Sequence, residues 1–510
     1  MPETTGPDVR TDAVRPAQGP AQGAVAPAST PDTAWFTHVS FGMFLHWGLY
    51  AMGARHEWLM NRERMTAQQY ERYFRRFDPD LFDAKEWASA AKAAGMRYVV
   101  LTTKHHDGFC LWDSHLTDYT VMHTPFGRDV VAEFVAAVRE AGLKVGFYHS
   151  LLDWHHPDFT IDGFHPQRDE PNAEALNAGR DMARYREYLH GQVRELLTEY
   201  GRIDYLFFDF SYGEGHTPPV WGGKDARDWH SEELLTMVRE LQPGILVNDR
   251  LGIPGDFVTP EQYQPERPLE RDGRPVLWEA CQTLNGSWGY DRDNSDYKSV
   301  GMLVLMLIDG VAKNGNLLLN VGPNGRGEFD RHAKDALDGI GDWMRLHGRS
   351  IYGAGASSFT PPTDVRYTQR DGRLYAHLFA WPFETLHLPG LADRVDYAQL
   401  LHDGSEVAMR VIDPHAQAQN MTQGSRRAPS LSRFRSAGPM SRCPSSSSSS
   451  GTEPRGASSL HPPARTSPVL ATGPGPADRC PRRVWTLPTG PLLDAHNGTG
   501  GQQPDPSAHG

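Results

Sequence analysis

Cysteine and long apolar runs are scarce in this chain, and both absences narrow what it can be. Its 510 residues include four cysteines, Cys110, Cys281, Cys443 and Cys480, and no two of them form a CxxC pair. The sequence therefore indicates neither a disulfide framework nor a structural zinc site. No stretch approaches the roughly 20 consecutive apolar residues that a membrane-crossing helix needs. Residues 1–31 contain no apolar run typical of a signal peptide, so we expect a cytoplasmic protein.

Basic residues are also fewer than acidic ones, 51 against 63, which gives a formal net charge of −12. This balance argues against nucleic acid and anionic membranes as partners. Hydrophobic residues make up 39% of the chain, with 13 Trp, 21 Phe and 18 Tyr, which suffices for a sizeable core. Aromatic rings can also stack on the apolar faces of sugars, but the surplus alone is explained by ordinary core packing.

The two ends of the chain differ in composition from its middle. Residues 1–31 are rich in Pro, Ala, Gly and Thr, which predicts a disordered leader. Residues 413–510 predict a low-complexity, disordered tail, and from Met421 onward they hold ten arginines, no lysine and four acidic residues. This tail is either a basic tether or a segment that was not selected, such as the product of a reading-frame shift. The second interpretation is favoured, because the strand pattern before the tail stops in mid-domain.

The central region, residues 32–352, alternates short apolar runs with longer amphipathic segments. Seven of the short runs predict strands, at 41–48, 98–104, 144–150, 203–209, 245–250, 276–282 and 316–322. Several of the predicted helices between them end in glycine, as at Gly95, Gly142 and Gly201. Strands that are apolar on both faces and alternate with helices indicate an α/β fold with a parallel sheet. No phosphate-binding glycine loop follows the first strand, so we predict a (β/α)₈-like TIM barrel, with its eighth unit among the less regular segments.

Residues 353–412 show a different pattern of short strands. The Asp-Gly pairs at Asp371-Gly372 and Asp403-Gly404 are strong hairpin signals. We therefore predict a small antiparallel β-sandwich after the barrel, truncated by the tail.

Chemically capable side chains gather at or just after the ends of the predicted strands, with Glu279 within the sixth, at the barrel end that carries active sites. They are His46, Lys104, His105, His106, Asp107, Tyr148, His149, Asp209, Asn248, Asp249, Arg250, Glu279 and Asn320. Each alone has an ordinary explanation. A histidine beside a strand is more often a core residue than a ligand, Asp249 and Arg250 suit a plain ion pair, and Glu57 suits a helix start. Structural roles alone do not explain why so many of these residues lie at the same end of the predicted strands.

Asp209 is the sharpest candidate for catalysis. The run IDYLFFD places a carboxylate directly after an apolar strand, which is costly unless the charge faces a polar cavity. Such a carboxylate among polar groups can serve as a nucleophile. Glycoside cleavage needs a second carboxyl, about 5–5.5 Å away for retention of configuration or about 6.5–9.5 Å for inversion. Glu261, Glu266 and Glu279 are the candidates, and the sequence alone does not choose between them.

These residues stand in motifs that resemble the α-L-fucosidases of glycoside hydrolase family 29. The motifs are FGMFLHWGLY, HEWLMNR, YVVLTTKHHDGFCLWDS, GRDVV, VGFYHSLLDW, IDYLFFD, VNDRLG, WEACQTLNGSWGY and GNLLLNVGPNGRGE. The resemblance runs from about Trp35 to Gly353 and more weakly to residue 412. It implies a retaining exo-α-L-fucosidase of carbohydrate metabolism that releases terminal α-linked L-fucose from glycans or glycoconjugates through a fucosyl-aspartate. It implies no cofactor and no metal.

The resemblance also implies roles for individual residues. Asp209 would be the nucleophile and Glu261 the acid/base residue, with Glu279 as the alternative. The residues that would line the fucose subsite are His46, Glu57, Trp58, His105, His106, Tyr148 and Arg250. The nucleophile motif departs from the family, because many relatives have Trp-x-Asp-Gly where this chain has Phe207-Phe208-Asp209-Phe210. Phe207 lacks an indole N–H, and Phe210 is expected to narrow the pocket or to change which aglycone fits.

Two other functions remain open at this stage. One is a metal-dependent barrel hydrolase that uses His105, His106 and Asp209, which ranks low because adjacent histidines are expected to point to different sides of a strand. The other is a sugar-binding protein whose catalysis is impaired by the aberrant tail. The expected partner is a fucosylated oligosaccharide or glycoside, without nucleic acid or membrane.

Overall fold

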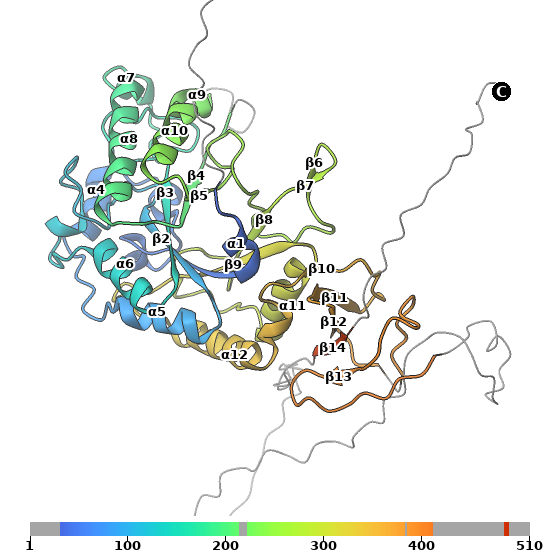
Figure 1. Cartoon of the computed structure of the whole chain (residues 1–510). Helices are drawn as coiled ribbons and strands as arrows, with labels where there is room; N and C mark the ends of the chain where they lie inside the picture. Colours follow the sequence, from blue (N-terminus) through green and yellow to red (C-terminus); the bar gives the residue numbers. More distant parts are fainter. Residues whose placement is uncertain (1–30, 214–221, 383–384, 412–483, 489–510) are drawn as a thin grey trace, which may run out of the picture.

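The computed structural model describes residues 31–213, 222–382, 385–411 and 484–488. Seven of its strands form one curled parallel sheet in the order β5-β4-β3-β2-β1-β9-β8 (Figure 1). They are β1 (Phe41–Leu45), β2 (Tyr98–Lys104), β3 (Lys144–Ser150), β4 (Tyr205–Asp209), β5 (Leu246–Val247), β8 (Trp278–Thr283) and β9 (Gly315–Val321). These are the seven strands predicted from the sequence, and a TIM-like barrel fits their arrangement.

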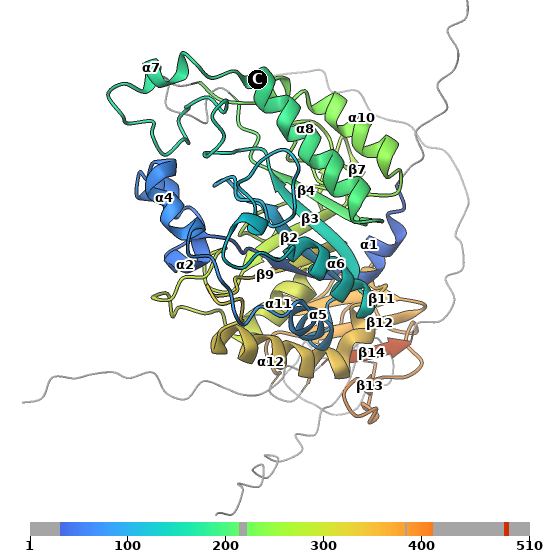
Figure 2. The ribbon, with the colours of Figure 1, turned by 90° about the vertical axis from the view of Figure 1, so that its left-hand side faces the viewer.

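Helices surround this sheet, and most of them lie around its outside (Figures 1 and 2). They are α1 (Ala34–Val39), α2 (Tyr50–Gly53), α3 (Leu59–Arg62), α4 (Ala67–Phe74), α5 (Ala84–Ala93), α6 (Val130–Glu140), α7 (Ala173–Asn177), α8 (Met182–Glu199), α9 (Ala226–Trp229), α10 (Ser231–Leu241), α11 (Val300–Val311) and α12 (Arg331–His347), with 3-10 turns at Val121–His123 and Gly348–Ser350. None of the helices in the described ranges has the length and apolarity to span a membrane.

Local sequence signals fix where these helices begin and end. The side chains of Asp83 and Asp129 accept hydrogen bonds from the first backbone amides of α5 and α6. Gly95 and Gly142, just after these helices, have positive φ, as the predicted glycine termination requires. The long helical pattern from residue 173 to 200 is broken into α7 and α8, because Asp181 caps a new helix by accepting from the Ala183 amide.

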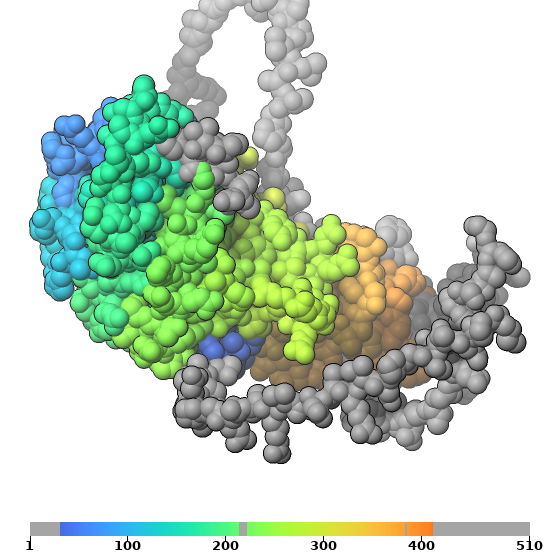
Figure 3. All heavy atoms as spheres, turned by 90° about the horizontal axis from the view of Figure 1, so that it is seen from above, coloured from blue at the N-terminus to red at the C-terminus, as the bar shows by residue number. Residues whose placement is uncertain are grey.

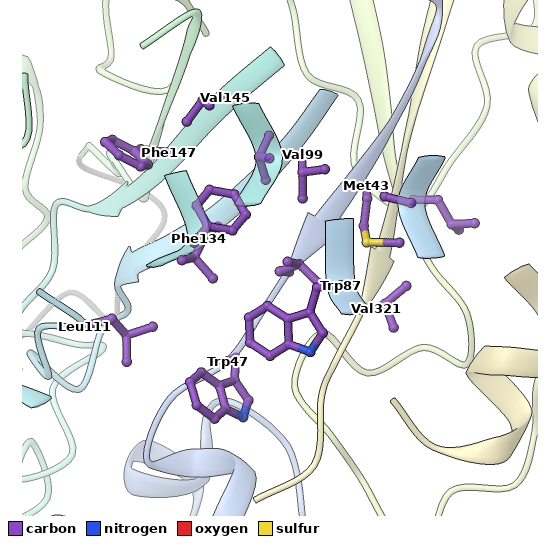
Figure 4. Close-up of a cluster of buried hydrophobic side chains, with 14 of the residues drawn as sticks. Met43, Trp47, Trp87, Val99, Leu111, Phe134, Val145, Phe147 and Val321 are labelled. Carbon is purple, nitrogen blue, oxygen red and sulfur yellow. The ribbon is translucent and has the colours of Figure 1, made fainter. Parts of the chain in front are cut away.

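Both faces of the parallel sheet are buried. Side chains such as Met43, Val99 and Val145 point outward and pack with Trp87 of α5 and Phe134 of α6 (Figure 4). The side chains that alternate with them point inward and form a second cluster: Phe44, Tyr98, Val100, Tyr148, Tyr205, Phe207 and Leu318. This double burial explains why the strands are apolar at successive positions.

An irregular segment lies between the two edge strands of the sheet. Phe257 forms a parallel bridge to Asn248, next to β5, and Val258 forms one to Trp278 in β8. The Glu279 and Cys281 amides donate to carbonyls of the same segment. The segment therefore contacts residues at both edges of the parallel sheet through isolated bridges.

A five-stranded antiparallel sheet follows the parallel domain, beside α11 (Figure 1). In the space-filling view, this orange part of the chain lies next to the yellow-green part of the parallel domain (Figure 3). Its strands are β10 (Gly355–Ala356), β11 (Val365–Arg370), β12 (Arg373–Leu378), β14 (Val484–Pro488) and β13 (Gln399–Leu400), and a separate hairpin joins β6 (Glu270–Arg271) to β7 (Arg274–Pro275). The turn between β11 and β12 is the predicted Asp371-Gly372 hairpin, with φ of 49° and 70°. In the described part of the chain we find this one sheet rather than the two layers of a sandwich.

Strand β14 belongs to the C-terminal segment that the sequence predicts to be disordered. It pairs with β12 on one side and with β13 on the other. The prediction is therefore wrong for residues 484–488, whose Val-Trp-Thr run suits a strand. The rest of that segment and the predicted leader up to residue 30 lie outside the described residues.

Candidate active site

A cavity of about 440 Å³ opens at the carboxyl ends of the parallel strands. Nine of the residues singled out from the sequence line it: His46, Glu57, Trp58, His105, His106, Tyr148, Asp209, Arg250 and Glu261. Tyr148 lies in β3 and Asp209 in β4, and the others lie in the loops that follow the strands. The parallel sheet thus brings together residues more than 200 positions apart in the chain.

Asp209 is the last residue of β4, and its carboxylate faces this cavity. Its Oδ2 accepts a hydrogen bond of 2.8 Å from the Tyr148 hydroxyl. Its Oδ1 accepts one of 2.8 Å from Nη1 of Arg250. Both donors stabilise negative charge on the carboxylate. The side chain is held in place on two sides and still lines the cavity.

Glu261 reaches the same guanidinium nitrogen. Its Oε2 also lies 2.8 Å from Arg250 Nη1. Asp209 Oδ1 and Glu261 Oε2 are therefore at most twice that distance apart. The Glu261 side chain is 41% exposed, against 13% for Asp209. One carboxylate is thus enclosed and fixed, while the other stands at the solvent side of the cavity.

Arg250 is positioned by Thr259 rather than by its neighbour in sequence. Its Nε donates to Thr259 Oγ1 at 2.9 Å and its Nη2 to the Thr259 carbonyl at 3.2 Å. Thr259 Oγ1 in turn donates to Asp249 Oδ1 at 2.9 Å. The alternative interpretation of Asp249 and Arg250 as a plain ion pair is therefore wrong, because the guanidinium is directed at Asp209 and Glu261.

Hydrogen bonds fix the tautomer of His46. Asn320 Nδ2 donates to the Trp288 carbonyl, so its Oδ1 is the atom 2.7 Å from His46 Nδ1. His46 Nδ1 therefore carries the proton, and its Nε2 remains an acceptor. Burial lowers the pKa of His46 to about 3, so the ring stays neutral at neutral pH.

His106 is held in a similar way, by a hydroxyl group. The Ser150 hydroxyl donates to the Leu152 carbonyl, so it accepts from His106 Nδ1 at 2.6 Å. The unprotonated Nε2 then lies 3.9 Å from Asp209 Oδ2. Burial lowers the pKa of His106 to about 3 and that of His105 well below its usual value. These neutral rings can accept hydrogen bonds from substrate hydroxyls.

Two buried polar atoms of the cavity lining lack a hydrogen-bond partner among the described residues. They are His105 Nδ1 and Glu57 Oε1. Glu57 Oε1 lies 3.1 Å from His56 Nδ1, but that nitrogen already accepts from the Trp58 amide and has no proton to donate. Unsatisfied buried polar atoms are costly, and here a ligand with several hydroxyl groups would satisfy them.

The other oxygen of Glu57 is fully engaged. Glu57 Oε2 accepts from the backbone amides of Gly289 at 2.9 Å and Trp288 at 3.2 Å. Burial raises the pKa of Glu57 to about 7, although these amides oppose the shift. The alternative interpretation of Glu57 as a helix-start residue is therefore wrong. Its carboxylate lines the cavity and is hydrogen-bonded to the loop that follows β8.

Phe210 follows Asp209 with a φ of 78°, in the left-handed region that favours glycine. This backbone geometry explains why a glycine suits the position in relatives of the Trp-x-Asp-Gly type. Here the ring compensates by packing in an aromatic cluster. Its centroid lies 5.0–5.2 Å from those of Trp58, His106, Phe164 and Tyr212.

The two alternative glutamates lie elsewhere. Glu279 is completely buried, and its oxygens accept from the hydroxyls of Tyr98 and Tyr205, the first residues of β2 and β4. It is thus near the amino ends of the strands, and it does not line the cavity. Glu266 lines a different depression, between α11 and the antiparallel sheet.

Several other polar residues at the strand ends are structural. Lys104 is buried outside the cavity, where its Nζ donates to Gln192 at 2.8 Å. Asp107 accepts from Tyr70, and the Asn248 side chain bonds to the backbone of Phe208. Position at a strand end therefore identified the site but did not separate lining residues from their neighbours.

The expected divergence of the two adjacent histidines is wrong. His105 and His106 both line the cavity, with ring centroids 4.1 Å apart, because they follow β2 rather than lie within it. Within the described ranges, however, no three His, Cys, Asp or Glu side chains are grouped so that they could hold a metal ion. His46 and His106 have one nitrogen each committed to Asn320 and Ser150.

Trp288 is a lining residue that sequence reasoning did not single out. Its ring lies 5.1 Å from that of His46, and its backbone bonds to both Glu57 and Asn320. The signal was present, since the motif WEACQTLNGSWGY contains it. Phe44, Phe207 and Phe210 also line the cavity and give it apolar walls.

Comparison with known proteins gives a consistent result. The family model described as Alpha-L-fucosidase matches residues 21–349. The α-L-fucosidase of Dictyostelium discoideum is 30% identical over 394 residues, 69% of this chain and 79% of that protein. The structure of α-L-fucosidase isoenzyme 1 from Paenibacillus thiaminolyticus is similar with a TM-score of 0.75 and 41% identity, covering 90% of this chain and 98% of that one.

A further similar structure is a trapped covalent intermediate. It is an α-L-fucosidase of family GH29 from Bacteroides thetaiotaomicron in complex with 2-fluoro-fucosyl fluoride, in a mutant that carries glutamine in place of a glutamate. It is 28% identical, has a TM-score of 0.67 and covers 81% of this chain and 98% of that one.

Proposed function

This chain belongs to the α-L-fucosidases of glycoside hydrolase family 29, and we propose that it is a retaining exo-enzyme that removes terminal α-linked L-fucose from glycans or glycoconjugates. In this proposal Asp209 is the nucleophile and Glu261 the acid/base residue. The fucose occupies the 440 Å³ cavity.

One observation carries the proposal. Asp209 and Glu261 bind the same nitrogen of Arg250 at 2.8 Å each, which keeps the two oxygens within twice that distance. Retaining glycosidases hold their two carboxyl groups about 5–5.5 Å apart, whereas inverting enzymes need room for a water between them. The shared guanidinium therefore supports retention.

The surroundings of each carboxyl suit its role. Asp209 is enclosed and receives hydrogen bonds from Tyr148 and Arg250, which orient it for attack on the anomeric carbon. Glu261 is more exposed, so it can give a proton to the glycosidic oxygen and later take one from water. Fucose then leaves with its original configuration after two displacements.

The lining of the cavity suits a small sugar. His46 and His106 each present an unprotonated Nε2, and Glu57 and His105 each hold an unpartnered atom for the ring hydroxyls. A sugar that lacks the matching hydroxyls would leave these atoms unpaired, which discriminates strongly against it. The covalent intermediate of the Bacteroides thetaiotaomicron relative supports a two-step route.

The strands and the segment around residues 256–262 support a complete (β/α)₈ barrel as the scaffold. The bridges of this segment to β5 and β8 are the supporting contacts. Closure would place Glu261, which bridges to Cys281, beside the mouth of the barrel.

Turnover of an aryl α-L-fucoside tests the assignment. Asp209→Gly should reduce kcat by at least about 1000-fold, because it removes the carboxylate that attacks the anomeric carbon. Glu261→Ala should slow substrates with poor leaving groups most, and added azide should restore part of the rate. Glu266→Ala is the matched control and should behave as wild type. Unchanged turnover of Asp209→Gly would refute the nucleophile.

A further inference from the structure

Three carboxylates lie close to the guanidinium group of Arg250 at the carboxyl ends of the strands. Asp209 Oδ1 and Glu261 Oε2 are each 2.8 Å from Arg250 Nη1. The third carboxylate belongs to Asp249, the residue directly before Arg250 in the chain. Among the described residues, Asp249 forms no ion pair, although its neighbour in sequence is basic. A local feature therefore keeps the guanidinium group away from Asp249.

The hydroxyl of Thr259 stands between these two neighbours. It donates to Asp249 Oδ1 at 2.9 Å and accepts from Arg250 Nε at 2.9 Å. The carboxylate oxygen and the guanidinium nitrogen are therefore at most twice 2.9 Å apart. A hydroxyl has one proton to donate and two lone pairs with which to accept, so it satisfies both neighbours at once. It separates an acid and a base that would otherwise be close enough to pair.

The backbone around Thr259 is fixed, so its hydroxyl is a rigid point of attachment for Arg250. The carbonyls on either side of it, those of Val258 and Pro260, accept from amides of β8 at 2.9 and 3.0 Å. The Thr259 side chain is buried. Its own carbonyl lies 3.2 Å from Arg250 Nη2. With Nε and Nη2 both held by Thr259, Nη1 is the nitrogen left to face the catalytic carboxyl groups.

We propose that Thr259 is a positioning residue whose hydroxyl prevents Arg250 from pairing with Asp249. The guanidinium group therefore stays on the carboxyl groups of Asp209 and Glu261. This inference rests on the proposed function, in which these two groups are the nucleophile and the acid/base residue. Thr259 is not one of the described residues that line the 440 Å³ cavity, so it acts through Arg250 rather than on the sugar.

Loss of the hydroxyl would change the partners of Arg250. Arg250 Nε and Asp249 Oδ1 would each lose a hydrogen-bond partner, and a direct charge-assisted hydrogen bond between them would satisfy both. To form it, the guanidinium group must turn and move Nη1 away from Asp209 and Glu261. A shared cation would then no longer fix the separation of the two catalytic carboxyl groups. Misplacement of reacting groups by about 1 Å can cost about 100-fold in rate.

Thr259→Val tests the proposal, because valine has nearly the shape of threonine but no hydroxyl. On an aryl α-L-fucoside its kcat should fall about 100-fold. Thr259→Ser keeps the hydroxyl, and its kcat should stay within about threefold of wild type. Thr259→Ala serves if denaturant unfolding shows that the valine variant does not fold. A kcat within about threefold of wild type in the valine or alanine variant would overturn the proposal.

A second substitution distinguishes positioning from a merely structural role. Asp249→Ala removes the competing carboxylate, so adding it to Thr259→Val should raise kcat at least about tenfold. Asp249→Ala alone completes the double-mutant cycle. Glu266→Ala in the Thr259→Val background is the matched control, because Glu266 lies in a different depression and its removal should restore nothing.

A recovery below about threefold in the double variant would overturn the proposal, because the loss would then not come from pairing with Asp249. Equal recovery with Glu266→Ala would overturn it as well. A wild type that does not hydrolyse the aryl α-L-fucoside would instead contradict the proposed function itself.

Discussion

Two glutamates buried at opposite ends of the parallel sheet show what distinguishes a functional group from a structural one. Burial raises the pKa of both Glu57 and Glu279 to about 7. Each oxygen of Glu279 accepts from a tyrosine hydroxyl, whereas Glu57 has one oxygen without a hydrogen-bond partner in the described structure. The pKa alone would make them equivalent. The unsatisfied oxygen at a cavity marks Glu57 as the one that binds a ligand.

The same contrast holds for the surroundings of the two residues. The Glu279 end is filled, because Trp35 and Phe36 of α1 pack against Tyr98 and Tyr205. The Glu57 end is hollow and lined by neutral histidines. We therefore expect substitutions at the hollow end to change activity more than stability, and substitutions at the filled end to do the reverse.

Glu57→Ala should produce the largest separation of the two effects. It removes an expected ligand for a sugar hydroxyl and leaves the Trp288 and Gly289 amides without their acceptor. We expect kcat/KM on an aryl α-L-fucoside to fall by about 100-fold. Glu57→Gln keeps an acceptor for both amides and should lose much less. An alanine variant with wild-type kcat/KM would contradict the assignment of Glu57 as a ligand-binding residue.

Glu279→Ala should act on stability instead. The hydroxyls of Tyr98 and Tyr205 would remain buried without an acceptor, at a cost of about 2 kcal/mol in the free energy of unfolding. Denaturant unfolding measures this loss, and active-site titration should give a near-normal kcat per folded molecule. A loss of kcat greater than about tenfold with normal stability would instead give Glu279 the catalytic role.

The pH dependence of stability gives a smaller and more specific effect. The pKa of Glu279 is about 7 in the folded protein and near 4.5 in the unfolded chain. The stabilising contribution of Glu279 to the free energy of unfolding is therefore fully present below pH 4.5 and is lost as the pH rises through 7. Glu279→Gln does not titrate, so the stability of wild type relative to this variant should fall by about 1 kcal/mol or more between pH 5 and 8. A pH-independent difference would contradict the raised pKa.

Much of the fold was predictable, because strands buried on both faces leave a continuous apolar signal. The seven strands and the Asp371-Gly372 hairpin follow from that signal and from turn chemistry. The segment around residues 256–262 was not found, since its contacts to β5 and β8 are single bridges without a strand pattern. Strand β14 was missed because five residues in a proline-rich segment are too few to reveal a period.

The sequence predicted where the candidate site lies, but it did not predict which side chains point into the cavity. Asp209 stands out because a charge ends an apolar strand. The choice between Glu261 and Glu279 needed the side-chain directions, because Glu279 lies in β8 and turns toward Tyr205 inside the sheet. The clustering of polar residues at the strand ends also predicted too many site residues, since Lys104, for example, is buried away from the cavity.

The most direct test of the central claim is to trap the intermediate with 2-fluoro-α-L-fucosyl fluoride and to map the labelled peptide by mass spectrometry. The account predicts one fucosyl adduct, on Asp209, formed in wild type and absent in Asp209→Gly. An adduct on another residue, or fucose released with inverted configuration and no adduct, would contradict it.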